Sequence, residues 1–390
     1  MDSKAFQNSP NGKLVPTRID LVPYLAFVPN PLPPTIEASW RLSNLTSQAD
    51  RALSELAGIG RNLPNPNLLI RPFMQREAVL SSMIEGTQTE MADLLAYQLR
   101  EAPLPGFEDA HASEADNREV LNYVHSLEYG IKVVKEREID EALLLELHRQ
   151  LLDGVRGNYA TPGRMREEQN YIGRSRNPEE ASYVPPPVIE MRWCMNDLIH
   201  YLNSKDDYPP LIRLAMVHYQ FEAVHPFRDG NGRIGRLLIS LLLSRWGLMP
   251  SPLLYLSAYF EATRQQYYEL LLGISQRGEW QAWLEYFLRG VEEQATDALK
   301  RGKELMDLRE EWRARLGERR VSKTAERLCD LLFEIPIVTI PEVQKRLGYK
   351  DYNSAKKAVQ QLVTEGILSQ SSPGDYERSF KAPRILEIVT

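Results

Sequence analysis

Apolar residues recur at helical spacing along most of this 390-residue chain, and this pattern constrains the fold more than any other feature. Runs with a period near 3.6 residues that end at glycine or proline predict amphipathic helices rather than strands. A first helix is expected after Thr35, with Gly58 and Gly60 ending it. Further helices are predicted at residues 67–84, 90–99, 113–135, 138–153, 189–204, 210–224, 231–246, 257–274 and 279–314. The body of the protein is therefore predicted to be all-α.

Two segments interrupt the helical pattern. From Pro10 to Pro34 the chain has seven prolines among short apolar pieces, which disfavours helix and predicts an extended arm lying on the core. Residues 171–187 include Ser182 and Tyr183 before a triple proline, and this composition favours a short β-hairpin, which we call the flap. A bare loop is the alternative for that segment.

The length of the chain exceeds what one hydrophobic core ordinarily supports, so several domains are expected. The pattern changes after Arg320, where helices are predicted at 324–333, 340–347 and 353–365 and two extended pieces within 369–381. This order is typical of a winged helix-turn-helix. The predicted domains are an N-terminal region at 1–110, a helical core at 111–315 and a winged helix-turn-helix at 316–390.

Composition and charge limit the classes of function. No apolar run approaches the roughly 18 residues that cross a bilayer, and residues 1–12 lack the apolar stretch of a secretory signal. A cytoplasmic location and no membrane partner are therefore expected. Cys194 and Cys329 have no metal-like spacing, which predicts two buried thiols and no disulfide. The net charge of -6 argues against a chain covered by nucleic-acid-binding basic surface.

The C-terminal region differs in charge from the rest of the chain. Residues 320–390 contain 11 Lys and Arg against 9 Asp and Glu, a net charge of +2, which leaves -8 for the remainder. The basic residues of this region form a scattered set: Lys345, Arg346, Lys350, Lys356, Lys357, Arg378 and Lys381. Docking of DNA or of a protein on this region is therefore an open alternative.

Residues that suit phosphate chemistry are concentrated in the stretch His225-Pro226-Phe227-Arg228-Asp229-Gly230-Asn231-Gly232-Arg233-Ile234-Gly235-Arg236, which joins two predicted helices. Gly230 and Gly232 let the backbone approach an anion, and the first turn of a helix offers free N–H groups and a favourable dipole. Asn231, Arg233 and Arg236 add the polar and cationic contacts that several phosphate groups require. We therefore predict a phosphate cradle over residues 230–236.

Two further side chains of this stretch suit phosphoryl or nucleotidyl transfer. Asp229 can hold Mg²⁺ through carboxylate oxygen. His225 has the one side chain whose ordinary pKa suits proton transfer near neutral pH, so it is the candidate general base for an attacking hydroxyl. Positioning and charge neutralisation would then do most of the catalysis.

Two other interpretations compete. The stretch could be a glycine-rich turn capped by charges, although a turn does not need Asp, Asn and two arginines together. His218, Glu222 and His225 lie at helical spacing and could instead bind zinc. The usual zinc helix places its histidines four residues apart, and that spacing is absent here. His218 is therefore predicted to be a structural histidine behind the site.

The stretch resembles the signature of Fic proteins, His-x-Phe-x-(Asp/Glu)-Gly-Asn-Gly-Arg-x-x-Arg, at every specified position. The resemblance spans about residues 20–310 and implies an N-terminal Fic-associated region followed by a Fic core. It further implies an enzyme that uses ATP and Mg²⁺ to transfer AMP to Ser, Thr or Tyr hydroxyls of target proteins, itself included. Nothing in the stretch departs from the AMP-transferring pattern.

Other segments carry the same resemblance. Pro162-Gly163-Arg164 and residues 169–173 resemble the part of Fic proteins that leads into their flap, with Tyr171 where Trp is common. The resemblance implies that the flap, with Ser182 and Tyr183, holds the target peptide by strand addition and borders the nucleotide. It also implies that Tyr267 and Tyr268 lie against the adenine, whereas tyrosines at helical positions are otherwise expected in the core.

Ser81-Ser82-Met83-Ile84-Glu85-Gly86 resembles the inhibitory motif of the family, (Ser/Thr)-x-x-x-Glu-(Gly/Asn), and lies on a predicted helix upstream of the core. The resemblance implies that Glu85 pairs with Arg236 and displaces the γ-phosphate of ATP, with Ser81 and Gly86 completing the motif. The alternative is a solvated glutamate before a helix-ending glycine.

Three functions stay open on the sequence alone. The first is autoinhibited AMP transfer, and the second is removal of AMP at the same site, with Glu85 positioning the hydrolytic water. The third is a DNA-binding regulator in which the Fic core is a sensor. A homodimer formed through exposed helical faces is a further hypothesis.

Overall fold

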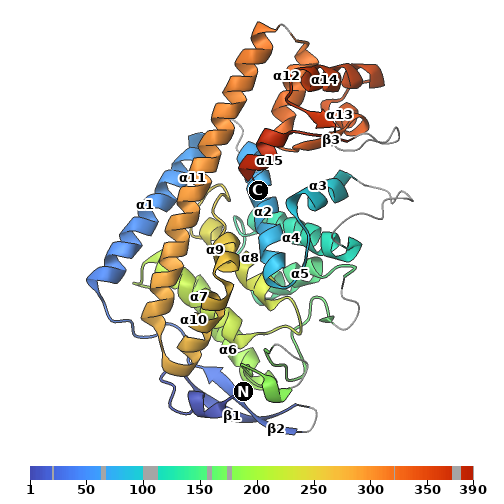
Figure 1. Ribbon diagram of the computed structural model, residues 1–390. Helices are drawn as coiled ribbons and strands as arrows, with labels where there is room; N and C mark the ends of the chain where they lie inside the picture. The colour runs from blue at the N-terminus through green and yellow to red at the C-terminus, as the bar shows by residue number, and fades with distance from the viewer. Residues whose placement is uncertain are drawn as a thin grey trace.

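The computed structural model describes residues 1–19, 22–62, 67–99, 113–155, 160–173, 178–319, 321–370 and 379–389. The protein is mostly helical, with helix over 65% of its length, so the predicted fold class is confirmed (Figure 1). The helices are α1 (Trp40–Asn62), α2 (Asn67–Ile84), α3 (Met91–Leu99), α4 (Glu114–Val133), α5 (Glu141–Leu151), α6 (Val188–Asn203), α7 (Pro210–Val224), α8 (Asn231–Arg245), α9 (Ser257–Ala262), α10 (Arg264–Arg277), α11 (Trp280–Glu318), α12 (Lys323–Leu332), α13 (Ile340–Leu347), α14 (Tyr352–Thr364) and α15 (Pro383–Val389). The strands are β1 (Gly12–Ile19), β2 (Val22–Pro29), β3 (Ile337–Thr339), β4 (Ser369–Gln370) and β5 (Ser379–Lys381).

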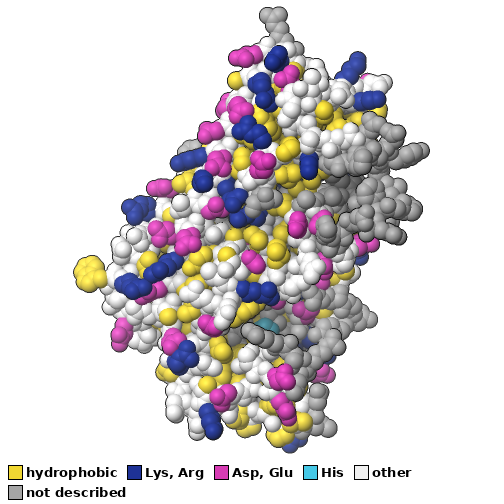
Figure 2. Space-filling model, in the orientation of Figure 1, with side chains coloured by type: hydrophobic (Ala, Val, Ile, Leu, Met, Phe, Trp, Pro, Cys, Tyr) yellow, Lys and Arg dark blue, Asp and Glu magenta, His cyan; other side chains and the backbone are white. Residues whose placement is uncertain are grey.

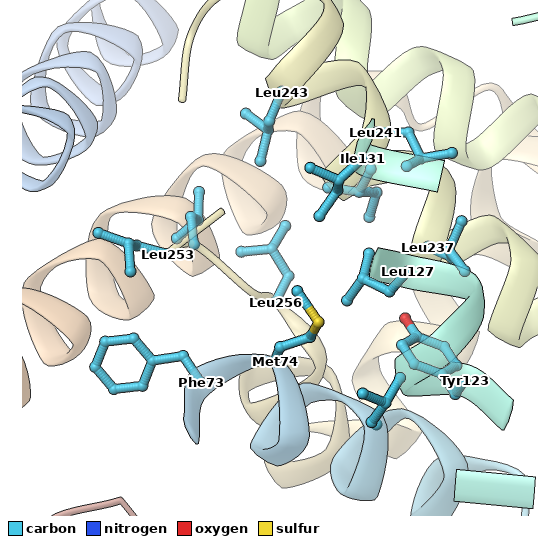
Figure 3. Close-up of a cluster of buried hydrophobic side chains, with 14 of the residues drawn as sticks. Phe73, Met74, Tyr123, Leu127, Ile131, Leu237, Leu241, Leu243, Leu253 and Leu256 are labelled. Atoms are coloured by element: carbon cyan, nitrogen blue, oxygen red, sulfur yellow. The ribbon is translucent and has the colours of Figure 1, made fainter. Parts of the chain in front are cut away.

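Helices α7 and α8 form the centre of the fold, and each is buried on nearly all sides. The long helix α11 packs on α7 and runs beside α1 along one side of the molecule (Figure 1). Helix α4 lies against α8 and also packs on α2 and α5. Figure 3 shows where these helices meet: Met74 of α2, Leu127 of α4 and Leu237 of α8 project into one apolar cluster. Full burial of such a side chain contributes about 1.5–3 kcal/mol.

Near the N-terminus, β1 and β2 pair as an antiparallel hairpin that brings Gly12 opposite Pro29. The segment predicted as an extended arm is thus a hairpin, in which the two strands satisfy each other's backbone groups. The hairpin also covers the flap, because the N–H of Phe27 donates to the carbonyl of Val184 (2.9 Å). Within the flap, the structure describes one antiparallel bridge, between Ile172 and Tyr183.

Two of the helix predictions were wrong in detail. Helix α1 continues through Gly58 and Gly60, because a Cβ at Gly60 would lie 3.1 Å from Leu253 and from Ser251, and glycine permits this close packing. The packing outweighs the cost of a helical glycine, about 1 kcal/mol. The single helix predicted at 257–274 is instead α9 and α10, which break at Thr263 (φ -119°, ψ 32°).

The chain after α11 forms a smaller set of elements beside the C-terminal end of that helix (Figure 1). Helices α12, α13 and α14 match their predicted positions, and β3, β5 and β4 form an antiparallel sheet in that order. Helix α15 was not predicted, and it packs on α11 and α2. The winged helix-turn-helix assignment and the three domain boundaries remain predictions. The region's Arg378 lies outside the described residues.

Charged side chains of both signs are mixed on the visible surface (Figure 2), whereas the two thiols lie inside the protein. Figure 2 shows Lys and Arg side chains interspersed with Asp and Glu over the visible face, without one dominant charged patch. Cys194 and Cys329 are both buried, as predicted. Among the helices of the described ranges, none combines the length and the apolar character needed to cross a membrane.

Candidate functional site

The candidate site is the loop between α7 and α8. Helix α7 ends at Val224 and is followed by His225, whose backbone is left-handed (φ 49°), and Gly230 takes a left-handed conformation (φ 81°) just before α8 begins. Glycine adopts such angles without the steric cost that a Cβ brings. Asn231 closes the loop, because its Oδ1 accepts from the N–H of Phe227 (2.8 Å) and its Nδ2 donates to the carbonyl of Phe227 (2.8 Å). The loop is therefore held in one conformation by its own residues.

The hydrogen bonding and the burial of His225 set the protonation of its ring. Its Nδ1 lies 3.3 Å from the carbonyl oxygen of Glu222. A carbonyl oxygen only accepts, so Nδ1 carries the proton and Nε2 keeps its lone pair. Burial, together with the positive charge of Arg166, lowers the pKa of His225 to about 4, which leaves the ring neutral at pH 7. A neutral imidazole with an unprotonated Nε2 is the form that accepts a proton from a hydroxyl.

Sequence reasoning missed Arg166, which joins the His225 loop to the flap. Its Nε donates to the carbonyl of His225 (3.0 Å), its Nη2 to the carbonyl of Pro186, and its Nη1 to the carbonyl of Glu168 (3.3 Å). Its own N–H donates to the carbonyl of Pro226 (2.9 Å). Burial lowers the pKa of Arg166 to about 10. Main-chain carbonyl partners leave no mark in a sequence, so no motif could have pointed to this residue.

Arg233, in the first turn of α8, is fully buried and pairs with Glu119 of α4 (Nη1 to Oε2, 2.7 Å). Its Nη2 lies 3.6 Å from Oδ1 of Asp229, which is too long for a hydrogen bond. Within the described residues, Nε and Nη2 of Arg233 have no hydrogen-bond partner. A buried donor that lacks a partner is costly, so these atoms are suited to an anionic ligand such as phosphate.

Asp229, the predicted Mg²⁺ ligand, is held by a second residue that sequence reasoning missed. His148 of α5 accepts from the N–H of Gly163 at Nδ1 (3.0 Å), so its Nε2 donates to the carbonyl of Asp229 (2.9 Å). The His148 ring also stacks on Phe227, with ring centroids 3.9 Å apart. Over the described ranges, no group of three or more His, Cys, Asp or Glu could hold a metal. Mg²⁺ needs fewer protein ligands than that, because phosphate oxygens and water complete its shell.

Arg236, one turn further along α8, is bound to the last turn of α2 and to Glu85, which directly follows that helix. Its Nε donates to Oγ of Ser81 (2.8 Å), and its Nη2 donates to the carbonyl of Ser81 (2.9 Å) and to Oε1 of Glu85 (2.7 Å). A Cβ at Gly232 would collide with the Glu85 carboxylate, so this carboxylate lies directly over the first turn of α8. Gly86 follows with φ 101°, a left-handed angle that ends α2.

The charge state of Glu85 follows from this contact. Burial alone would raise its pKa, but the charge and hydrogen bond of Arg236, with further help from Arg233, lower the pKa below its ordinary value. The Glu85 side chain is nevertheless 31% exposed, whereas that of Arg236 is buried. The ion pair implied by the resemblance is therefore present, with an ionised carboxylate at the edge of solvent.

The zinc interpretation does not agree with the positions of its residues. His218 is buried, with Nδ1 bound to the carbonyl of Gly235 (3.2 Å) and Nε2 bound to the hydroxyl of Tyr267 (2.9 Å). Both ring nitrogens are thus occupied by protein partners, as predicted for a structural histidine. The carboxylate of Glu222 packs against Gly235, and burial raises its pKa to about 8.

The remaining predicted contacts differ in how they face the site. Tyr267 is 1% exposed and its hydroxyl is used by His218, so its side chain belongs to the core. Tyr268 is 44% exposed, so its side chain is the accessible one of the two, and its contact with the adenine remains a prediction. Ile234 is completely buried and offers only its backbone.

The two flap residues also differ. Tyr183 is buried against Phe6 and Phe27, and its hydroxyl donates to the carbonyl of Ala223 (2.9 Å). Its side chain therefore anchors the flap to the core. Ser182 is exposed, and its Oγ donates to the carbonyl of Ile172 (3.0 Å). Nucleotide contacts by these two residues remain predictions.

Comparison with known proteins gives two adjacent family matches. Residues 43–132 match the model described as Fic/DOC family N-terminal, and residues 138–243 match the Fic/DOC family model. The second range contains the whole loop between α7 and α8, and the first contains the turn with Glu85.

Curated relatives match parts of the chain at modest identity. A protein of Drosophila grimshawi named "Protein adenylyltransferase Fic" is 33% identical over 141 residues, which is 35% of this chain and 26% of that protein. The protein of the same name from Nematostella vectensis is 28% identical over 234 residues, 59% of this chain and 49% of that protein. The matched part thus spans between a quarter and a half of the length of these relatives.

Solved structures extend the likeness to the fold. A Fic family protein from Desulfovibrio desulfuricans matches with a TM-score of 0.58 at 18% identity, over 90% of this chain and 98% of that one. Fic-1 from Caenorhabditis elegans matches with a TM-score of 0.53 at 24% identity, over 68% of this chain and 74% of that one. At these identities the likeness concerns the fold, and function depends on the site.

Proposed function

This chain belongs to the Fic/DOC family, and we propose that it transfers AMP from ATP to a Ser, Thr or Tyr hydroxyl of a target protein. One observation carries the proposal. The loop that holds His225 as a neutral base leads directly into the first turn of α8, where Nε and Nη2 of the buried Arg233 have no hydrogen-bond partner within the described residues. A base for a hydroxyl next to donors for phosphate is what nucleotidyl transfer requires. The names of the curated relatives support the same activity.

The start of α8 fits the phosphates of ATP. Arg233 offers two buried donors, and Gly232 has no side chain of its own, so the first-turn N–H groups become accessible once the Glu85 carboxylate moves away. Asp229 would hold Mg²⁺ through a carboxylate oxygen, and the bound ion would neutralise phosphate charge. Of the two tyrosines, we assign the contact with the base to Tyr268, because its side chain is 44% exposed whereas Tyr267 is buried.

The residues of the loop then have distinct roles in the reaction. The target hydroxyl gives its proton to Nε2 of His225 while its oxygen attacks the α-phosphorus of ATP. A P–O ester bond forms, the bond from the α-phosphorus to the oxygen bridging to the β-phosphorus breaks, and pyrophosphate leaves. The hydrogen bond from Nδ1 to Glu222 holds the ring in place during the transfer. The donors of Arg233 stabilise the charge that develops on the phosphates.

We further propose that Glu85 inhibits this reaction. Its carboxylate occupies Arg236 and covers Gly232, which is where a third phosphate would otherwise find a cation and free N–H groups. A carboxylate and a phosphate compete for the same guanidinium. Productive binding of the γ-phosphate therefore requires Glu85 to leave Arg236.

The test is incubation of wild type, Glu85→Gly and His225→Ala with Mg²⁺, a cell lysate as the source of targets, and ATP labelled on the α-phosphate. We expect weak protein labelling by wild type, at least about tenfold more by Glu85→Gly, and none by His225→Ala. A parallel reaction with ATP labelled on the γ-phosphate should label no protein, because that phosphate leaves with pyrophosphate.

The double variant Glu85→Gly, His225→Ala separates the role of His225 as the base from the inhibitory role of Glu85. Labelling by this variant would show that His225 is not the base. Labelling from the γ-phosphate would show phosphoryl transfer instead of AMP transfer. If no variant labels protein from either form of ATP, the proposed activity is wrong.

A further inference from the structure

Helix α2 carries three polar residues at intervals of four along one side, Glu77, Ser81 and, directly after the helix, Glu85. Ser81 and Glu85 both bind Arg236, as described above. Glu77 lies two turns before Glu85, outside the site, and has a different set of partners. The inhibitory role that we propose for Glu85 depends on how firmly this helix is held.

Glu77 is a buried carboxylate that ties α2 to two other elements. Its Oε1 accepts from Oγ of Ser257 (2.6 Å) and from the hydroxyl of Tyr123 (3.1 Å), and its Oε2 accepts from the N–H of Ser257 (3.1 Å). Ser257 is the first residue of α9, and Tyr123 lies in the middle of α4. One side chain therefore links three helices.

Glu77 is only 3% exposed, and the small cavity that it lines contains apolar side chains such as Phe73 and Leu253 as well as the charged Arg76 and Asp297. In Figure 3, Met74 of α2, Tyr123 of α4 and Leu256, which precedes α9, project into the same cluster. A carboxylate in such surroundings is costly unless its oxygens are satisfied, and hydrogen bonds to it are directional. Rotation or sliding of α2 would break these bonds and leave the carboxylate unsatisfied. The bonds therefore fix the register of α2 against α4 and α9.

The turn that carries Glu85 is also held from the other side. Arg264, the first residue of α10, donates through Nη2 to the carbonyl of Ile84, the last residue of α2. Helix α10 follows α9 after a single residue, so Ser257 and Arg264 belong to connected helices. Glu77 and Arg264 thus hold the two ends of the segment that delivers Ser81 and Glu85 to Arg236.

We infer that Glu77 is a positioning residue for inhibition by Glu85, because its bonds to α4 and α9 set the register in which Glu85 reaches Arg236. This inference rests on the proposed function. Loss of the Glu77 bonds lets the last turn of α2 shift, which frees Arg236 for phosphate. AMP transfer should then rise, although Glu77 touches neither the His225 loop nor α8 by any hydrogen bond of the described residues.

The main test variant is Glu77→Gln, which keeps the size of the side chain but turns an NH₂ donor toward other donors. We expect its transfer of label from α-labelled ATP to rise roughly tenfold over wild type. Ser257→Ala removes one donor and keeps the carboxylate, so its rise should be smaller, roughly threefold. Thermal unfolding of each variant confirms that it is folded.

A matched control is Gln75→Leu. Gln75 is a buried polar residue of the same helix, but it donates to Gln98 of α3 (2.8 Å). It lies two residues before Glu77 in the sequence and therefore on a different side of the helix. General loosening of α2 would raise transfer in this variant too. Positioning by Glu77 predicts transfer at the wild-type level in Gln75→Leu.

The Glu85→Gly background separates positioning from structural damage. If Glu77 acts through inhibition by Glu85, adding Glu77→Gln to Glu85→Gly gives no further rise, whereas damage to the fold lowers transfer in both backgrounds. Amide hydrogen exchange over residues 81–86 provides a reading that needs no reaction, and Glu77→Gln should increase it. This reading separates the inference from the proposed function, which fails if Glu85→Gly labels nothing.

Unchanged exchange over residues 81–86 in a folded Glu77→Gln protein would overturn the inference, as would a rise in exchange equalled by Gln75→Leu. If Glu85→Gly labels protein and Glu77→Gln does not exceed wild type, the inference is also wrong. If Glu77→Gln fails to fold, the same criteria apply to Ser257→Ala.

Discussion

The two arginines of α8 form ion pairs of the same length in very different surroundings. Arg233 pairs with Glu119 at 2.7 Å, and both side chains are at most 4% exposed. Arg236 pairs with Glu85 at the same distance, but the Glu85 side chain is 31% exposed. Access of solvent to one partner, and not distance or charge, distinguishes the two pairs. Arg233–Glu119 has the properties of a permanent part of the fold, and Arg236–Glu85 those of a contact that can open.

The elements that supply the two carboxylates differ in the same sense. Glu119 lies within the 20-residue helix α4, which packs on α2, α5 and α8. Glu85 lies in the turn after α2, beside Gly86, and the N–H of Thr87 returns to the carbonyl of Ser82 (3.2 Å). Moving Glu119 would disturb the core, whereas moving Glu85 disturbs one turn. The buried pair Arg233–Glu119 is therefore expected to contribute more to stability. The pair Arg236–Glu85, whose glutamate is partly exposed, is expected to control access to the site.

The largest expected effect is that of Glu119→Ala on stability. The variant leaves Arg233 buried without its partner, so its free energy of unfolding should fall by about 3–5 kcal/mol. Glu85→Ala opens a pair with one solvent-exposed member and should lower it by about 1 kcal/mol or less. Equilibrium unfolding in urea measures both values. Equal losses in the two variants would break the comparison between the pairs.

A smaller effect concerns Glu77, a buried carboxylate bonded to hydroxyls and an N–H instead of an arginine. Burial raises its pKa from 4.5 to about 7. The native state then holds the proton more tightly than the unfolded state, so the free energy of unfolding falls as pH rises between those values. The loss from pH 5 to pH 8 due to Glu77 should be about 3 kcal/mol.

Urea unfolding of wild type and Glu77→Gln at pH 5 and at pH 8 isolates this contribution. Burial also raises the pKa of Glu222, to about 8, so both proteins should lose stability with rising pH. The wild type should lose about 3 kcal/mol more than Glu77→Gln. The same slope in both proteins would mean that Glu77 titrates near its ordinary pKa.

The smallest expected effect is that of pH on inhibition by Glu85. The pKa of Glu85 is lowered, mainly because Arg236 outweighs burial, so the stabilisation by this pair is present above the ordinary pKa of 4.5. It is lost only as pH falls through the lowered value. The ratio of AMP transfer by Glu85→Gly to that by wild type should therefore stay within about twofold from pH 6 to pH 9. A ratio that collapses toward one at pH 6 would show that Glu85 is protonated there.

Local patterns were enough to predict most helices. The predicted range of α2, 67–84, agrees with the structure, because apolar spacing and the following glycine are properties of the segment itself. Gly60 was wrongly predicted to end α1, because its effect depends on close packing against Leu253, which lies far away in the chain. Thr263 was missed because its break depends on a hydroxyl that binds the carbonyl of Tyr259 (2.6 Å) and the hydroxyl of Tyr286 (2.7 Å).

The candidate site divides in the same way. His225, Asp229 and Arg233 could be predicted because they stand in one contiguous stretch whose residue types match phosphate chemistry. Arg166 and His148 could not, because each supports that stretch from another part of the chain through backbone carbonyls. Every residue has a backbone carbonyl, so partners of this kind produce no pattern in the sequence.

The sequence by itself determined the helical body, the loop from His225 to Arg236, and the pairing of Glu85 with an arginine as an expectation from resemblance. Only the tertiary structure decided that Tyr267 is buried while Tyr268 is exposed, and that Arg233 is held by Glu119 while Arg236 is held by Glu85. The physical reason is that residue type sets what a group can bond to. Burial and the meeting of distant helices set which bond it makes and whether that bond can open.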